Sequence, residues 1–497
     1  MTQRRDSAKE WEAILAELEE RRAAARALGG PERVERLMTA RGKLDARKRL
    51  ALLFDEGTFV EIGGLAGGAA APADALVAGM GRIHGKPALA GAEDFTVLGG
   101  SIGSAAMAKR FRICELAGQE GVPLVFLLDG AGHRLTERHP PGRTPNDLLA
   151  LADLSGQVPM VCLVLGASAG HGALTAPLSD FTIMTESAAM FTAGPPLVQA
   201  ATGEEVTKEE LGGPQVAVDR AGVAHNVAPD DEAAIAMARR YLSHLPGSSR
   251  EPPPRRSGPD VGPRLLADLL ERIPPNPRRP YAMRPVLESL VDAESLFEVQ
   301  PRYGTSLITA LAFLGGRAVA IVANDPSVRG GAVDSAAAIK AADFIEHVGA
   351  FGLPFVFLAD NPGVMAGTAA EKDGILKWAG KMYRAQRRLR SPKLHVTFRK
   401  AFGFGTSIMA QNPFDRQTLC WAFPTVTLGA MPAESGGRAA RLDEPEQERV
   451  EREQSAGAWR IAERFGYDDV IDPRELRNVL LSGLDLLENR LARPQAG

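Results

Sequence analysis

The chain has 497 residues, of which 45% are hydrophobic and 24% are charged, and its formal net charge is -3. This length predicts at least two domains, and the small net charge gives no electrostatic basis for binding nucleic acid or an anionic membrane. The three cysteines are too far apart for a disulfide framework or a zinc motif. The N-terminal segment has no apolar core of a secretion signal, and no apolar run is long enough to span a bilayer, so we expect a soluble cytoplasmic protein.

The composition changes along the chain predict an arm, two domains and a linker. Near the start, Trp11, Ile14 and Leu15 recur at helical spacing within a charged segment, which predicts a solvated or partner-contacting helix. The sequence LPGSSREPPPRRSGPD in the middle of the chain is rich in Pro, Ser and Gly and lacks periodicity, as is typical of linkers. The expected bounds are 1–30 for the arm, 31–245 for the N-terminal domain, 246–260 for the linker and 261–497 for the C-terminal domain.

The two halves of the chain resemble each other. Gly99–Gly132 and Gly330–Gly363 are both 34 residues long and align without a gap, with 15 identical positions and an offset of 231. Each segment has a Gly-Gly turn, a helix-compatible stretch, Gly-x-Pro, an apolar strand, and then Asp followed by a glycine turn. Self-similarity of this length indicates duplication of a whole domain. Strands that alternate with helices predict an α/β fold in each copy.

The similarity continues at an offset of 233, where an apolar strand runs into a Gly-x-Gly turn. The two turns are Gly170–Gly172 and Gly403–Gly405. A turn from a strand into a helix leaves the first helical N–H groups without intrahelical partners. Two such donors aimed at a thioester oxygen form an oxyanion hole, which contributes about 3 kcal/mol per donor. The duplication therefore predicts two oxyanion sites.

The first turn also fits a different chemistry. Gly166–Gly170 reads GASAG and matches G-x-S-x-G, the nucleophile elbow of serine hydrolases, with Ser168 as the nucleophile. In the second copy Ser168 becomes Ala401, whereas the outer glycines of Gly-x-Gly persist. The donor turn is thus the better hypothesis, and a serine hydrolase stays a remote alternative. His171 becomes Phe404 in the second copy. Its imidazole therefore either takes part in the chemistry or is simply packed at the turn.

These segments resemble the carboxyltransferase (β) subunit of biotin-dependent acyl-CoA carboxylases of the propionyl-, acetyl- and methylcrotonyl-CoA type. The similarity covers nearly the whole chain, and EDFTVLGGSIG (Glu93–Gly103) and RKAFGFGTSIM (Arg399–Met409) are among its specific motifs. The resemblance implies a tandem duplication of a crotonase-like ββα-superhelix domain. It implies transfer of CO2 from carboxybiotin to the α or vinylogous carbon of an acyl-CoA through an enolate.

The resemblance also implies roles for particular residues. The backbone donors of the two oxyanion holes would be Gly170 and His171, and Phe404 and Gly405. The acyl-CoA side would comprise Ala131, Gly132, His133, Arg134 and Gly172. The biotin side would comprise Pro362, Gly363, Val364, Thr406 and Ser407. No metal site is predicted, because His133 and His139 lack a convergent third ligand.

The implied partners follow from what the sequence lacks. The chain has no Met-Lys-Met biotinylation motif, so biotin and the biotin carboxylase are expected on separate subunits. The family implies homo-oligomers, namely dimers assembled into a hexamer. The family usually has Gly-Gly at Gly170-His171 and Gly-Ala at Phe404-Gly405, which leaves the acyl substrate open. Alternatives are a biotin-dependent decarboxylase or transcarboxylase subunit, a biotin-independent crotonase-like acyl-CoA enzyme, and a non-catalytic scaffold.

Overall fold

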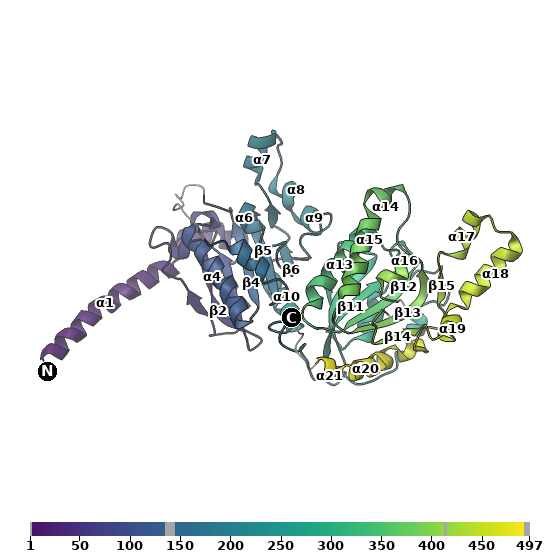
Figure 1. Cartoon of the computed structure of the whole chain (residues 1–497). Helices are drawn as coiled ribbons and strands as arrows, with labels where there is room; N and C mark the ends of the chain where they lie inside the picture. Colours follow the sequence, from purple (N-terminus) through teal and green to yellow (C-terminus); the bar gives the residue numbers. More distant parts are fainter. Residues whose placement is uncertain (1, 135–144, 412–414, 492–497) are drawn as a thin grey trace. The chain divides into compact units, whose positions relative to one another are not determined.

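The computed structural model describes residues 2–134, 145–411 and 415–491 (Figure 1). His139 lies outside the described residues, as does the end of the predicted C-terminal domain beyond residue 491. The chain forms two compact units, Met1–Leu242 and Ser243–Gly497. Between α10 (Asp231–Ser243) and α11 (Leu269–Arg272) the chain has no helix or strand, a stretch that includes the Pro-rich segment.

The first unit is built on an eight-stranded sheet in the order β1-β2-β3-β4-β5-β6-β8, with β7 paired to β5. The first three strands are antiparallel, and the pairs from β3 onward are parallel. Its strands are β1 (Val60–Ile62), β2 (Leu76–Ile83), β3 (Lys86–Glu93), β4 (Leu124–Gly130), β5 (Met160–Ala169), β6 (Phe181–Thr185), β7 (Ala189–Phe191) and β8 (Asn226–Ala228).

The second unit repeats this sheet in the order β9-β10-β11-β12-β13-β14-β16, with β15 paired to β13. The same change from antiparallel to parallel pairing occurs at its third strand. Its strands are β9 (Phe297–Val299), β10 (Leu307–Leu314), β11 (Arg317–Asn324), β12 (Phe355–Asn361), β13 (Lys393–Phe402), β14 (Leu419–Ala422), β15 (Thr427–Gly429) and β16 (Asp469–Val470).

The strand bounds confirm the predicted duplication residue by residue. The bounds of β2, β3 and β4 become those of β10, β11 and β12 at the offset of 231, and β5 becomes β13 at 233. The register of the central pair also shifts at the same place, between Leu128 and Gly130 in one copy and between Ala359 and Asn361 in the other. Both central strands are buried along their whole length, as expected for parallel strands covered on both faces. This is the tandem crotonase-like α/β fold that the sequence predicts.

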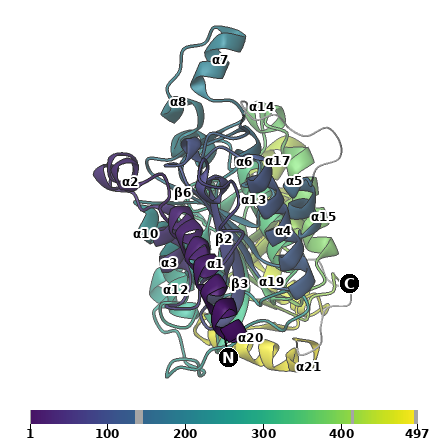
Figure 2. The ribbon, with the colours of Figure 1, turned by 90° about the vertical axis from the view of Figure 1, so that its left-hand side faces the viewer.

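Helices cover both sheets. In the first unit they are α1 (Thr2–Arg26), α2 (Pro31–Leu37), α3 (Ala46–Leu53), α4 (Ser104–Glu120), α5 (Asp147–Asp153), α6 (Gly170–Ala173), α7 (Pro195–Thr202), α8 (Lys208–Gly212), α9 (Pro214–Ala217) and α10. Helices α4 and α5 lie side by side in Figure 2 and contact each other. Helix α1 extends from the body of this unit (Figure 1), and Trp11 and Ile14 of its apolar stripe are exposed.

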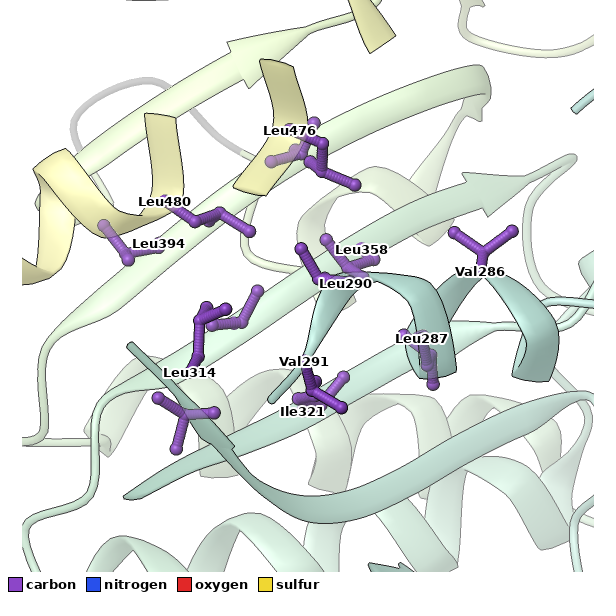
Figure 3. Packing of buried hydrophobic residues seen from close by; sticks show 14 of the residues in the cluster. Val286, Leu287, Leu290, Val291, Leu314, Ile321, Leu358, Leu394, Leu476 and Leu480 are labelled. Atoms are coloured by element: carbon purple, nitrogen blue, oxygen red, sulfur yellow. The ribbon is translucent and has the colours of Figure 1, made fainter. Parts of the chain in front are cut away.

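In the second unit the helices lie on both faces of the sheet. They are α11, α12 (Arg284–Leu290), α13 (Ser335–Gly349), α14 (Thr368–Lys372), α15 (Ile375–Arg388), α16 (Phe404–Ile408), α17 (Ala433–Ala440), α18 (Glu444–Ser455), α19 (Gly457–Ala462), α20 (Leu476–Leu486) and α21 (Glu488–Leu491). Figure 3 shows α12 and α20 packed on one face through Leu287, Leu290 and Leu480. Burial of such side chains contributes roughly 1.5–3 kcal/mol each, and this core holds the central strands in place.

None of the described helices is both long and apolar enough to cross a membrane.

Candidate active site

The two predicted turns occupy equivalent places at the end of the longest strand of each unit. Strand β5 ends at Ala169 and α6 begins at Gly170, while β13 ends at Phe402 and Gly403 precedes α16. Gly170 and Gly403 have φ values of 55° and 54°, a left-handed conformation that favours glycine. Each turn therefore begins with a glycine at a positive φ. The N–H groups of the first helical residues have no intrahelical acceptor in such a turn.

In the first unit, the predicted acyl-CoA loop lies against the turn. A Cβ atom on Gly132 would lie 2.6 Å from the carbonyl oxygen of Ala169. The loop is held by the N–H of Ile102, which donates to the carbonyl oxygen of Gly132 at 2.8 Å. Arg134 forms an ion pair with Asp74 at 2.6 Å, while Ala131 and His133 are exposed. The structure thus brings the predicted acyl-CoA residues together with Gly170–Gly172.

In the second unit, the predicted biotin loop lies against its own turn in the same way. The side chain of Asn361 accepts the N–H of Gly363 at 3.0 Å. A Cβ atom on Gly405 would lie 2.1 Å from Asn361 Oδ1 and 2.7 Å from Gly363 Cα, so only glycine fits there. Val364 forms a parallel bridge with Val333, as His133 does with Ile102 in the first unit. The two loops are therefore equivalent parts of the duplicated fold.

The remaining predicted residues of the biotin side belong to α16. Thr406 Oγ1 donates to the carbonyl oxygen of Gly403 at 2.8 Å, which caps the turn. The carbonyl oxygen of Ser407 accepts from Gln386 on α15 at 2.8 Å. Pro362 precedes Gly363 in the loop and is half-buried. These contacts fix the main chain of α16 beside the loop.

The two bulky residues in the turns point to different surroundings. The ring of Phe404 meets Tyr383 of α15 edge-on at 5.4 Å between ring centroids, and 41% of Phe404 is exposed. The side chain of His171 is only 15% exposed, and its Nε2 lies 2.6 Å from Asp147 Oδ1. Its ring also meets that of His133 edge-on at 4.9 Å.

Sequence reasoning missed the polar residues behind His171. Arg110 of α4 donates from Nε to Asp147 Oδ2 at 2.5 Å and from Nη2 to Thr175 Oγ1 at 2.6 Å. Its Nη1 lies 3.4 Å from Glu93 Oε1 at the end of β3. Asp147 is 24 positions from His171, and no motif joins the two. Only the packing of α4 and α5 on the sheet reveals the connection.

The pKa values of the two carboxyl groups behind His171 shift in opposite directions. For Asp147, burial raises the pKa, but the hydrogen bond from His171 and the charge of Arg110 outweigh it and lower the pKa to about 2. For Glu93, burial dominates and raises the pKa to about 7 despite Arg110. Asp147 is therefore ionised near neutrality, while Glu93 titrates there.

Ser168 lacks the surroundings that a nucleophile needs. Its side chain is fully buried, and its Oγ has no hydrogen-bond partner among the described residues. A nucleophilic serine requires a base within hydrogen-bond reach. Gly166, the first glycine of the apparent elbow, has a different reason to be glycine, because a Cβ there would lie 1.8 Å from Asp129 Oδ1. The hydrolase alternative has no support in this geometry.

Comparison with known proteins agrees with these features. The carboxyl transferase domain family matches residues 38–496. The chain belongs to this family. It is 35% identical to the methylmalonyl-CoA carboxyltransferase 12S subunit of Propionibacterium freudenreichii subsp. shermanii, over 97% of this chain and 96% of that subunit. It is 33% identical to the mitochondrial propionyl-CoA carboxylase beta chain of Sus scrofa, over 95% and 90% of the two chains.

A solved member of the carboxyl transferase family has the same fold. The transcarboxylase 12S structure, a hexamer assembly with hydrolysed methylmalonyl-coenzyme A bound, matches with a TM-score of 0.89 at 34% identity. The match covers 98% of this chain and 97% of that one. The chain is thus an acyl-CoA carboxyltransferase, as its sequence predicts.

Proposed function

We propose that the first unit binds the acyl-CoA and the second unit binds carboxybiotin delivered by a separate carrier subunit. The observation that supports this division is the pair of equivalent turns, each with its own loop packed against it. Ala131–Arg134 with Gly172 contact the acyl-CoA. Pro362–Val364 with Thr406 and Ser407 contact biotin.

The chemistry of the transfer needs two backbone oxyanion holes. The N–H groups of Gly170 and His171 hold the thioester oxygen while it carries the enolate charge. Those of Phe404 and Gly405 hold the ureido oxygen of biotin. Every residue except proline supplies an N–H, so His171 and Phe404 are compatible with this role. Removing one such donor typically slows catalysis by about 10²–10³-fold.

The main chain of the second unit suits the ureido ring of biotin. Gly405 lets the turn pack directly on the loop, because a Cβ there would lie 2.1 Å from Asn361 Oδ1 and 2.7 Å from Gly363 Cα. Carboxybiotin supplies CO2 and, after its release, a ureido nitrogen that accepts a proton. The residues of the second unit position and polarise the ring.

The acyl substrate is a short acyl-CoA. The relatives named for methylmalonyl-CoA and propionyl-CoA match along nearly their whole length, which supports a substrate of that size. The biotin carboxylase and biotin carrier are separate partners, and the chain forms a hexamer, in keeping with the hexameric 12S assembly. A transcarboxylase subunit, which passes the carboxyl group between two substrates, is the second candidate because a 12S subunit is among the relatives.

Reconstitution tests this proposal. The purified chain is mixed with carrier and biotin carboxylase subunits, ATP, labelled bicarbonate and a panel of acyl-CoAs from acetyl to octanoyl. We expect label in the acid-stable acyl-CoA fraction, highest for a short chain and absent without carrier. Fixation without the carrier, or none with any acyl-CoA, contradicts the proposal. Carboxyl transfer from methylmalonyl-CoA through the carrier to a second acceptor, without ATP or the carboxylase, favours the transcarboxylase. Sedimentation velocity tests the hexamer.

A further inference from the structure

The imidazole of His171 is held in one orientation at the acyl-CoA turn. Its Nε2 lies 2.6 Å from Asp147 Oδ1, and the other oxygen of that carboxylate accepts from Arg110 at 2.5 Å. Asp147 begins α5, and Arg110 lies within α4. Both are fully buried, so two packed helices position the carboxylate that orients the ring.

This contact determines which ring nitrogen carries the proton. An ionised carboxylate only accepts hydrogen bonds, so Nε2 of His171 must be the donor. In the neutral imidazole the lone pair is then at Nδ1. No described residue forms a hydrogen bond with Nδ1, because the contacts of the ring are those with Asp147 and His133. Nδ1 is also the ring nitrogen nearest to the main chain, and therefore to the N–H of His171 itself.

We propose that His171 is a catalytic base of the acyl-CoA half of the site, and that it removes the α-proton of the acyl-CoA in the absence of biotin. The α C–H bond breaks, its proton forms an N–H bond at Nδ1, and the electron pair moves to the thioester oxygen as an enolate. Return of a proton from Nδ1 regenerates the acyl-CoA. The chain alone thus exchanges the α-protons of its substrate with solvent. The inference rests on the proposed placement of acyl-CoA at Gly170–Gly172.

The surroundings of His171 distinguish a base from a packed ring. Its counterpart Phe404 meets the ring of Tyr383 and is 41% exposed, whereas the imidazole of His171 contacts a buried carboxylate. The imidazole contacts Asp147 from α5 and His133 from the loop. Behind Asp147, Arg110 from α4 pairs with that carboxylate and with Glu93 from β3. Arg110 lies between the two carboxyl groups, so the negative charge behind the ring is compensated.

The test follows proton exchange and carboxyl transfer in parallel. The chain without partners is incubated with propionyl-CoA in D2O, and deuterium at the α-carbon is measured by mass spectrometry. We expect the wild-type chain to introduce deuterium at the α-carbon without any partner subunit. In His171→Gln, exchange falls by about 10²–10⁴-fold, the usual contribution of a general base. The matched control is His84→Asn, on the β2–β3 turn, which changes neither activity.

Two further variants separate catalysis from structure. His171→Gly introduces the glycine usual in the family and keeps the backbone N–H. Exchange of the α-protons therefore falls far more than carboxyl transfer does. Added imidazole restores the exchange. Asp147→Asn removes the positioning residue, which slows exchange and changes its pH profile, and Asp147→Glu recovers part of both.

The experiment distinguishes a failure of this inference from a failure of the proposed function. Wild-type transfer without α-proton exchange overturns the inference and leaves the proposed function intact. Exchange in His171→Gly at the wild-type rate also overturns it. If exchange depends on His171 but the chain transfers no carboxyl group with its partners, the inference stands and only the proposed function is contradicted.

Discussion

Arg399 donates from Nε to Asp360 Oδ2 at 2.7 Å, and both side chains are completely buried. Arg399 occupies the position in β13 that Gly166 holds in β5, and Asp360 is the counterpart of Asp129. In the first unit, Asp129 is instead neutralised by Lys43 at 2.5 Å and by Arg49 at 3.0 Å. Both copies keep a buried aspartate at the end of the central strand and neutralise it from different parts of the chain.

Replacing Arg399 by Met is expected to destabilise the second unit strongly. The change leaves Asp360 buried without its principal cation, and breaking a buried ion pair from one side typically costs about 3–5 kcal/mol. Denaturant unfolding monitored by circular dichroism gives the free energy of unfolding. The double variant Arg399→Met with Asp360→Asn should lose less than the sum of the single changes, because they share one interaction.

An exposed ion pair serves as the control for this experiment. Arg278 and Glu434 are 80% and 54% exposed and lie 3.3 Å apart. Exposed pairs contribute less than about 1 kcal/mol, so Arg278→Met should leave the unfolding curve nearly unchanged. Equal losses for the Arg399 and Arg278 variants would show that the buried pair does not stabilise the unit.

The sequence predicted the duplicated fold because each copy contains the same local signals in the same order. Gly-x-Pro precedes the central strand, and Asp followed by a glycine turn ends it, so the offset of 231 recovers the strand bounds. The sequence also shows that Ser168 is lost in the second copy, but it does not explain why Gly166 becomes Arg399. That reason is the neutralisation of a buried aspartate, which depends on contacts between distant segments.

The network behind His171 could not be predicted for the same reason. Asp147 begins a short helix without a recognisable motif, and Arg110 lies in a helix whose sequence gives only its amphipathic face. Their contact depends on how α4 and α5 pack against each other, and spacing along the chain does not encode it. A buried Arg between two acids becomes apparent only when burial and distance are known together.

Gly405→Ala should strongly slow carboxyl transfer from biotin. The new methyl group would lie 2.1 Å from Asn361 Oδ1, so the loop or the turn must move. A shift of about 1 Å at a reacting centre can cost roughly 10²-fold in rate. Gly380→Ala is the matched control, since a Cβ there meets nothing within 4 Å and alanine favours the helix. Full transfer activity in Gly405→Ala would contradict the assignment of this turn to the site.

Phe404→Ala should affect the biotin half of the reaction selectively. The variant keeps the N–H of residue 404 but loses the ring that meets Tyr383 and is 41% exposed. We expect a changed KM for the biotin carrier, while the Kd for propionyl-CoA measured by calorimetry stays the same. A change in Kd for the acyl-CoA with no effect on the carrier would reverse the assignment of the two units.

Glu93→Gln should flatten the dependence of stability on pH. Burial raises the pKa of Glu93 from 4.5 to about 7, so the folded state holds more protons than the unfolded state between these pH values. The stability present below pH 4.5 is therefore lost progressively as the pH rises towards 7. Gln keeps an acceptor for the N–H of Asp129, which Glu93 binds at 2.9 Å. Unfolding curves of both proteins from pH 4.5 to 8 measure the difference, and parallel profiles would contradict the buried titration.

Ser168→Ala should retain carboxyl transfer and leave the fold unchanged. The Oγ of Ser168 is buried without a hydrogen-bond partner among the described residues, so its removal breaks no described contact. Removing an unsatisfied buried hydroxyl is neutral or stabilising, because its desolvation is no longer uncompensated. Transfer kinetics and thermal unfolding of the variant test both expectations. A nucleophilic serine needs an activating base, and Ser168 lacks one among the described residues. Labelling of the wild-type chain, but not of Ser168→Ala, by a fluorophosphonate probe would therefore contradict both expectations.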